Sequence, residues 1–424
     1  MHLPFSTPDL PGIGGNIKVR DEDFFVQEIP LYEASGEGEH VYVEIQKVGM
    51  ATFTALTNVA KALNVSQRDI GYAGMKDARA VTRQVFSIWG TTPEAVMAMR
   101  IPGITVQWAA RHGNKLRLGH LAGNRFAIKV RDVEPTDVIK AQAIMRVLEK
   151  RGVPNYFGEQ RFGRRANNDK LGAALIRADN IEVLRLLLGD PREDLDDHKT
   201  LIARKAFEKR DNELSMKSWP RTAGLERRVL SKLVNSKKPG HAVKSIDEKL
   251  RRLWISALQS KAFNDVLAMR IETFDKIEKG DLAYKHDNGA VFRVEDPETD
   301  SPRAEAFDIS PTGPLLGYRM TMPEGRPLEI EQAIFTAYNL SPEMFKQSGQ
   351  HRIKGARRSL RVRPTDLDFA GGVDDHGAFI TVAFTLPAGS FATVVMNEVM
   401  KVSEVKAEPV ESEMDDLPDD VDEE

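Results

Sequence analysis

The hydrophobic and polar residues of this chain recur with two different periods. Apolar residues occupy every second position in 41–45, which is typical of a half-buried strand. In 52–63 they recur at helical spacing instead. Short β-favouring runs predict further strands over 85–89, 115–121 and 125–131. The first part of the chain is therefore predicted to be rich in strands, with a few helices.

From about residue 165 the pattern becomes helical and strongly basic. Helices are predicted over 168–189 and 246–273. The segment 199–252 is dense in Lys and Arg, which is typical either of a solvated helix face or, as we predict here, of a surface that contacts phosphates. The Pro- and Gly-containing run 310–317 is predicted to be a turn. A clear strand pattern returns at 378–386, followed by a closing helix. This order predicts an α+β protein in which a strand-rich domain is interrupted by a helical one.

Composition narrows the class of protein. The chain has 424 residues, of which 41% are hydrophobic and 29% charged, as expected of a globular protein. It has no membrane-length apolar run and no signal-peptide pattern at its start. Without cysteine it has no disulfides, no thiolate chemistry and no thiol-ligated zinc, and its nine His show no paired metal spacing. We expect a cytoplasmic monomer that uses neither metal nor cofactor.

The charge is unevenly distributed along the chain. The net charge is −3, but residues 408–424 contain ten acidic residues and no basic ones. The remaining 407 residues carry 60 basic against 53 acidic side chains, a balance of +7. A basic body suits a polyanionic partner, and RNA is the partner we expect. The segment 406–424 is predicted to be a disordered acidic tail, which either solubilises the protein or competes with RNA for the basic body.

One carboxylate stands out among the candidate chemical groups. Asp77 lies on a Gly-containing turn between Lys76 and Arg79, directly before the predicted strand 85–89. Neighbouring cations favour the ionised form of a carboxylate, which can then act as a nucleophile or stabilise charge. From the spacing alone, an ordinary surface loop with ion pairs is the more frequent explanation of such a pattern.

The run from residue 73 to 84, AGMKDARAVTRQ, resembles the signature A-G-x-K-D-x-x-A-x-T-x-Q of the TruD family of tRNA pseudouridine synthases. Every fixed position of the signature is filled, and the resemblance implies that Asp77 is catalytic. It also implies supporting roles for Lys76 and Gln84 in substrate binding. A second element, K-x-x-x-(D/E)-D-F, is matched from Lys18 to Phe24, and the resemblance places Lys18 beside Asp77.

Further elements resemble the same family and carry the remaining site predictions. The family's G-N-x-F element implies that Phe126 stacks on the target uracil and that Asn124 helps to hold the catalytic loop. Its P-N-Y-F-G-x-Q-R-F-G element is matched over 154–163. The substrate-binding residues predicted from that element and from the later basic strand are Asn155, Phe157, Gln160, Arg161, Arg357 and Arg358.

The resemblance covers about residues 14–402 and implies the fold. We expect a pseudouridine-synthase fold, a mixed, largely antiparallel sheet with flanking helices, interrupted by a helix-rich α+β TruD domain. The predicted boundaries are 1–157 and 351–405 for the catalytic domain and 158–350 for the basic inserted domain. Asn397 departs from the family, which commonly has Arg there.

The function implied is isomerisation of a specific uridine in tRNA, by family resemblance uridine-13, to pseudouridine. The sequence leaves open whether Asp77 attacks the sugar at C1′ or removes a sugar proton to give a glycal. The alternative is a non-catalytic RNA-binding or RNA-folding protein, which the basic body also suits. A zinc deaminase would need the cysteines that the chain lacks, and Gly12–Gly15 is a weak match to the nucleotide loop of a methyltransferase.

Overall fold

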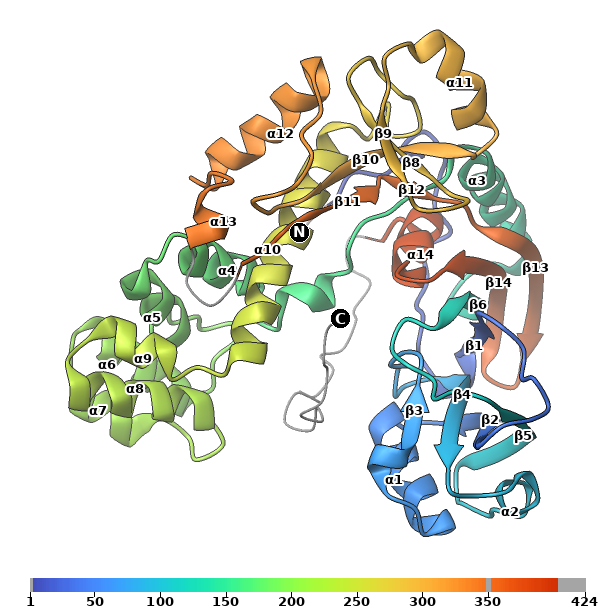
Figure 1. Cartoon of the computed structure of the whole chain (residues 1–424), viewed down its shortest axis with the longest axis horizontal. Helices are drawn as coiled ribbons and strands as arrows, with labels where there is room; N and C mark the ends of the chain where they lie inside the picture. Colours follow the sequence, from blue (N-terminus) through green and yellow to red (C-terminus); the bar gives the residue numbers. More distant parts are fainter. Residues whose placement is uncertain (1–2, 348–351, 403–424) are drawn as a thin grey trace. The chain divides into compact units, whose positions relative to one another are not determined.

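The computed structural model describes residues 3–347 and 352–402, so the predicted acidic tail lies outside the described residues. The chain forms two units (Figure 1). We call residues 4–155 with the chain from Val362 the terminal unit, and residues 156–361 the central unit. The chain leaves the terminal unit two residues before the predicted boundary and returns to it eleven residues after the predicted one. That the terminal unit is the catalytic domain stays a prediction.

A mixed sheet of eight strands, counted within the described residues, forms the terminal unit. Its strands are β1 (Phe24–Pro30), β2 (His40–Val48), β3 (Ile70–Tyr72), β4 (Val81–Trp89), β5 (Ile104–His112), β6 (Leu121–Arg131), β13 (Thr365–Asp374) and β14 (Gly377–Pro387). Their order is β13-β14-β6-β1-β4-β2-β5, with β3 paired to β4. Only β1 and β4 run parallel, and the other neighbours in this sheet are antiparallel. The predicted fold class is confirmed in this respect.

Helices cover the sheet of the terminal unit in two groups (Figure 1). The unit contains α1 (Thr52–Leu63), α2 (Pro93–Met97), α3 (Val138–Arg151) and α14 (Ala392–Met400), with the short strand β7 (Val153–Pro154) and 3-10 turns such as η1 (Asp21–Asp23). The first core joins α3 and α14 to alternate residues of β1, β6 and β14. The second joins α1 and α2 to β2 and β4. Helix α1 coincides with the prediction because Leu56, Val59 and Ala60 form one buried face.

The strand predicted over 115–121 is wrong for most of its length, because β6 begins only at Leu121. The backbone before it is committed to turns and loop contacts. The amide of Leu116 donates to Ser87 Oγ at 2.8 Å, and that of Gly119 donates to the carbonyl of Ala73 at 2.8 Å. These bonds replace the ladder partners that a strand would need. Strands β5 and β6 follow each other in the chain but not in the sheet, where β2, β4 and β1 lie between them.

The central unit is built around a long helix, α10 (Glu248–Met269), and the shorter helix α4 (Asn168–Ile176) packs against it. Its other helices are α4 (Asn168–Ile176), α5 (Asn180–Leu188), α6 (His198–Glu208), α7 (Asn212–Ser218), α8 (Gly224–Ser236), α9 (Pro239–Lys244), α11 (Pro297–Glu305), α12 (Gly325–Ala337) and α13 (Met344–Gln347). One core gathers α5 to α9 at one end of α10, and a second joins α10 to α12 and α13. None of the helices in 3–347 and 352–402 is long and apolar enough to cross a bilayer.

A small antiparallel sheet, in the order β11-β10-β8-β9, completes the central unit. Its strands are β8 (Leu282–Lys285), β9 (Val291–Arg293), β10 (Ile309–Leu315) and β11 (Ala356–Ser359), and β12 (Arg361–Val362) follows as the chain returns. Strand β10 was predicted to be a turn because of its two prolines. It can form a strand because the carbonyl of a proline still accepts hydrogen bonds. The carbonyl of Pro311, for example, accepts a hydrogen bond from the amide of Leu360 at 2.8 Å. Pairing of β11 with β10 is also why the return to the terminal unit comes later than predicted.

Candidate active site

The loop between β3 and β4 carries Asp77 and is held by three neighbouring side chains. Gln84 Nε2 donates to the carbonyl of Gly74 at 2.5 Å. Thr52 Oγ1, at the start of α1, accepts from the amide of Lys76 at 2.9 Å. The ammonium of Lys47, a fully buried side chain, donates to the carbonyl of Asp77 itself at 3.2 Å. The backbone on both sides of the carboxylate is therefore fixed by strand and helix residues.

The Asp77 carboxylate forms an ion pair with Lys18. Lys18 Nζ lies 2.7 Å from Asp77 Oδ2, and the two side chains are 20% and 35% exposed. Lys18 also lies over the Phe24 ring, 4.5 Å from its centroid, and its carbonyl accepts from Arg79. Lys18 has a φ of +56°, a conformation that few non-glycine residues adopt. The predicted pair thus exists, and its carboxylate remains accessible from solvent.

A buried ion pair lies beneath the loop. Glu28 on β1 and Asn124 on β6 are directly opposite each other in the antiparallel register. Lys76 Nζ reaches both, at 2.9 Å from Glu28 Oε2 and 2.6 Å from Asn124 Oδ1. Burial raises the pKa of Glu28, and the charge of Lys76 opposes that rise. Lys76 was predicted to bind substrate, but the structure places its ammonium inside the protein, where it ties the loop to the sheet. Asn124 takes the loop-holding place that was predicted for it.

Phe126 lies on the same face of β6 as Asn124, two positions further along. Its ring packs edge-on to Phe24, with centroids 6.4 Å apart, and 5.5 Å from Phe384. Only 7% of Phe126 is exposed. Phe126 therefore packs behind Phe24, the ring that Lys18 contacts, and Phe24 and Phe126 together form an aromatic wall that belongs to the core. The role of Phe126 as a stacking surface for uracil stays a prediction.

The predicted residues Phe157, Arg161 and Arg358 come together in the central unit. The guanidinium of Arg358 lies 4.2 Å and that of Arg161 5.5 Å from the Phe157 ring centroid. Asn264 fixes the Phe157 backbone by accepting from its amide and donating to its carbonyl, at 2.8 and 3.0 Å. Burial, followed by the nearby charge of Arg161, lowers the pKa of Arg358 to about 10. Gln160 is exposed beside this cluster in the chain, whereas Asn155 is buried and belongs to the terminal unit.

Arg357 does not match its predicted role in substrate binding. Its guanidinium forms a two-pronged ion pair with Glu331 at 2.6 and 2.9 Å and also donates to Thr312. Its side chain is only 4% exposed. Burial raises the pKa of Glu331, and Arg357 counteracts that effect. Arg357 therefore holds β11 to α12, and its donors are already used.

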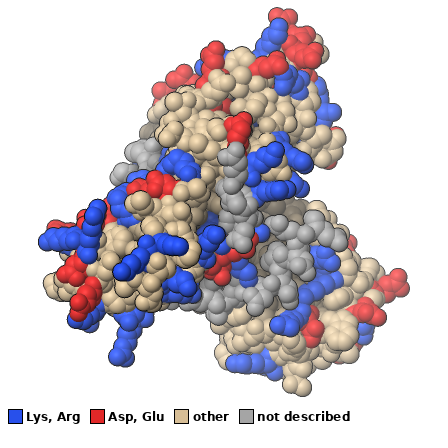
Figure 2. Space-filling model, turned by 60° about the vertical axis from the view of Figure 1, so that its left-hand side comes forward, with Lys and Arg blue, Asp and Glu red and all other residues tan. Residues whose placement is uncertain are grey.

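The basic segment 199–252 is also less uniform than its sequence suggested. Arg204 is buried and donates to the carbonyls of Leu187 and Gly189. Lys205 and Lys217 pair with acidic residues of the same unit. Figure 2 shows Lys and Arg exposed over the face in view, with Asp and Glu among them. Part of the predicted phosphate-binding surface thus serves the fold of the unit itself.

Three residues of the site were missed from the sequence: Glu28, Lys47 and Thr52. Two of them carried a readable signal. In β1, Phe24, Val26 and Glu28 alternate onto the buried face. In β2, Lys47 follows Val41, Val43 and Ile45 at the same spacing. A charged residue at the inward position of an alternating strand needs a buried partner, and it points to an internal ion pair or anchor.

The chemical group that the site offers is a carboxylate. Within the described part of the chain, no three His, Asp or Glu side chains are grouped as metal ligands. What the terminal unit presents is a solvent-accessible, ion-paired carboxylate on an anchored loop, beside an aromatic wall in a mixed sheet. This is the fold and the arrangement that the resemblance led us to expect of a pseudouridine synthase.

Comparisons with known proteins identify the family. A sequence profile of tRNA pseudouridine synthase D (TruD) matches residues 4–399. The tRNA pseudouridine synthase D of Geobacter metallireducens is 46% identical over 94% of this chain and 97% of its own length, and that of Thermus thermophilus is 34% identical over 98% and 97%. A crystal structure from Methanosarcina mazei, described as a candidate TruD, has a TM-score of 0.84 at 28% identity and covers 95% of this chain and 99% of its own. The chain belongs to the TruD family of tRNA pseudouridine synthases, which are isomerases.

Proposed function

We propose that this enzyme converts one uridine of tRNA, by family resemblance uridine-13, to pseudouridine, with Asp77 as the essential carboxylate. The observation that supports this most strongly is the Lys18–Asp77 pair at 2.7 Å on an anchored yet accessible loop. The contact with the Lys18 ammonium restricts the orientation of the carboxylate. An anion held in one orientation is what either chemical route to pseudouridine requires.

The reaction breaks the N1–C1′ bond, turns the uracil and forms a C5–C1′ bond, after which C5 loses a proton and N1 gains one. Asp77 has two possible roles in it. It can attack C1′ as a nucleophile, or it can take a proton from C2′ so that a glycal forms. The target base must first leave its stack, and we propose that Phe126 receives it. The loop anchors Gln84, Thr52 and Lys47 keep Asp77 in place during these steps.

We further propose that the terminal unit is the catalytic domain and the central unit the inserted TruD domain. The Asp77 loop with all its anchors belongs to the terminal unit. The central unit supplies Arg161, Arg358 and exposed Lys and Arg that suit phosphate contacts, which fix register without reading sequence. We expect the enzyme to act as a cytoplasmic monomer without a cofactor.

The test is Asp77→Asn, which keeps the size of the side chain and removes its charge. We expect uridine conversion to fall by more than about 10³-fold, as for loss of an essential nucleophile or base, while tRNA affinity changes less than about threefold. Pseudouridine mapping of a tRNA pool, run beside binding measurements, gives both quantities. Asp69→Asn, an acid in the turn before β3, is the matched control and should keep full activity.

The outcomes separate the alternatives. Conversion at one site by wild type but not by Asp77→Asn supports the proposal. Binding without conversion by either protein would favour the non-catalytic RNA-binding alternative. Equal conversion by both would show that Asp77 is not the essential group.

A further inference from the structure

The central unit contains a pocket that none of the predicted site residues lines. The segments 317–319 and 352–355 run side by side, because the amides of Tyr318 and Arg319 donate to the carbonyls of Ile353 and Lys354 at 3.0 and 2.9 Å. Two glycines permit this approach: a Cβ on Gly317 would lie 2.2 Å from the amide nitrogen of Gly355, and Gly355 itself has a φ of +80°. The fully buried Phe345 anchors the short helix α13 over the same segments.

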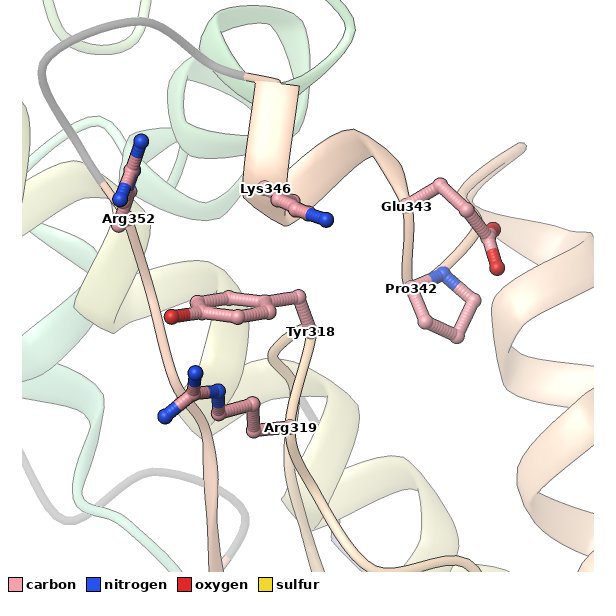
Figure 3. Close-up of a pocket in the computed structure, with 6 residues that line it drawn as sticks. All are labelled: Tyr318, Arg319, Pro342, Glu343, Lys346 and Arg352. Carbon is pink, nitrogen blue, oxygen red and sulfur yellow. The ribbon is translucent and has the colours of Figure 1, made fainter.

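The pocket has a volume of about 400 Å³, and its walls are mostly basic and aromatic (Figure 3). It is lined by Tyr318, Arg319, Pro342, Glu343, Lys346 and Arg352. We call it the Tyr318 pocket. Figure 3 shows Arg319 on one side of the Tyr318 ring, with Lys346 and Arg352 on the other side and the carboxylate of Glu343 turned away. The Arg319 guanidinium lies 5.4 Å from the ring centroid.

The charges of this pocket are unbalanced. Arg319, Lys346 and Arg352 are exposed, and none forms an ion pair with a described residue. Glu343, the one acid in the wall, is held by a hydrogen bond with Ser341, which lowers its pKa. Three cations around one aromatic ring repel one another and attract an anion. A ring that offers a face, with cations around it, is the combination that binds single-stranded nucleic acid, because bases stack and phosphates pair.

We propose that the Tyr318 pocket holds an unstacked nucleotide of the tRNA, with its base on the Tyr318 face opposite Arg319 and its flanking phosphates on Arg319, Lys346 and Arg352. This inference rests on the proposed function for its substrate. The volume suits one nucleotide, since pockets for small ligands measure roughly 300–1,000 Å³. The site adds to the enzyme's hold on RNA without touching the reacting uridine, so it acts on affinity and not on the chemical step.

The stacking part of the inference is tested with the full-length enzyme by Tyr318→Ala and Tyr318→Phe. Loss of one stacked base weakens binding by about fivefold or more. Tyr318→Ala should therefore raise the Kd and the KM for tRNA by at least about fivefold and leave kcat at saturating tRNA unchanged. Tyr318→Phe, which keeps the ring, should bind within about twofold of wild type. Equal weakening by both variants would overturn the stacking assignment.

The electrostatic part is tested by the triple variant Arg319→Gln/Lys346→Gln/Arg352→Gln. These side chains are exposed, so the variant should fold as wild type does. Removal of three phosphate contacts should reduce the slope of log affinity against log salt by about 2 to 3. Arg326→Gln is the matched control, because Arg326 is exposed in the same unit and pairs with Glu278. It should leave the slope unchanged.

The two proposals fail in different ways. If wild type does not convert uridine, the proposed function fails, whereas the salt slope still reports on the pocket. If wild type converts uridine but the triple variant binds tRNA with unchanged affinity and slope, the pocket inference is overturned. It is also overturned if the variants lose binding only to free uridine monophosphate or to a hexaglutamate peptide, because the pocket would then serve a free nucleotide or an acidic peptide.

Discussion

Cations serve opposite purposes in the Asp77 region and in the Tyr318 pocket. Near Asp77, Lys18 and Lys76 each pair with a carboxylate, and Lys76 is buried while doing so. In the Tyr318 pocket, three exposed cations lack ion pairs with the described residues. A charge removed from water needs a partner, whereas an exposed one does not. The first region therefore uses charge to fix a structure, and the second keeps charge available to a polyanion.

The difference follows burial rather than the unit in which a residue lies. Arg357 belongs to the same unit as the Tyr318 pocket, yet it is buried and fully paired with Glu331. In sequence Arg357 and Arg352 look alike, as cations of one basic segment. Only their exposure separates a structural ion pair from a candidate RNA contact. Substitutions of paired and unpaired cations therefore test whether burial decides the role of a cation.

The largest effect is expected at the buried pair Glu28–Lys76. Lys76→Met leaves the Glu28 carboxylate in the interior without its cation and should lower the free energy of unfolding by about 3–5 kcal/mol. The double variant Lys76→Met/Glu28→Leu removes both charges and should recover part of that loss. Urea unfolding, with hydrogen exchange of the β1 and β6 amides to follow the terminal unit, measures both changes.

Lys140→Met is the matched control for this loss. Lys140 lies in the same unit and pairs with Asp137, but its side chain is 44% exposed. Its removal should cost less than about 1 kcal/mol, as for other surface pairs. If Lys76→Met cost no more than Lys140→Met, burial would not be what separates the two kinds of cation.

Lys18→Met tests the half-exposed pair and should act on chemistry more than on stability. Without its partner the Asp77 carboxylate loses its fixed orientation, and a small misplacement of a reacting group can cost about 10²-fold in rate. We expect kcat to fall by about that factor, with the unfolding free energy changed by less than about 1 kcal/mol. Lys18→Arg, which keeps the charge, should retain more activity than Lys18→Met. Equal activity of Lys18→Met and wild type would remove Lys18 from the mechanism.

Much of the local structure could be predicted because the periodic segments were unambiguous. Helix α1 has the predicted bounds, and β14 differs from its prediction by one residue at each end. Strand β10 could not be predicted, since its two prolines are tolerated only through pairing with β8 and β11, which lie distant in sequence. The false strand at 115–121 has the same cause: its backbone partners, Ser87 and Ala73, come from another part of the chain.

The candidate site also contains residues that could be predicted from the sequence and residues that could not. The Asp77 loop and Lys18 could be found because a short, specific pattern marks them. Their partner Glu28 could not be assigned, because its approach to Lys76 depends on the register that places it opposite Asn124. Arg357 was misassigned for the converse reason. Its basic neighbourhood is visible in sequence, whereas the acid that neutralises it lies 26 residues away, on a helix that packs beside its strand.

The smallest effect is expected from His286, a titratable group in the turn after β8, near the guanidinium of Arg361. His286 Nε2 lies 2.8 Å from Ser310 Oγ, which already accepts from Arg361 Nε at 2.9 Å. Burial lowers the pKa of His286, Arg361 adds to this effect, and Asp308 opposes it. As the pH falls below about 6.5, the unfolded chain therefore binds a proton before the folded protein does, and stability is lost with acid.

His286→Gln cannot titrate, so wild type should lose more stability than this variant in urea unfolding between pH 7.5 and pH 5. His241→Gln, at an exposed position in α9, is the matched control. An identical pH dependence for wild type and His286→Gln would mean that burial beside Arg361 does not oppose protonation of this imidazole, and that His286 contributes nothing to the acid dependence of stability.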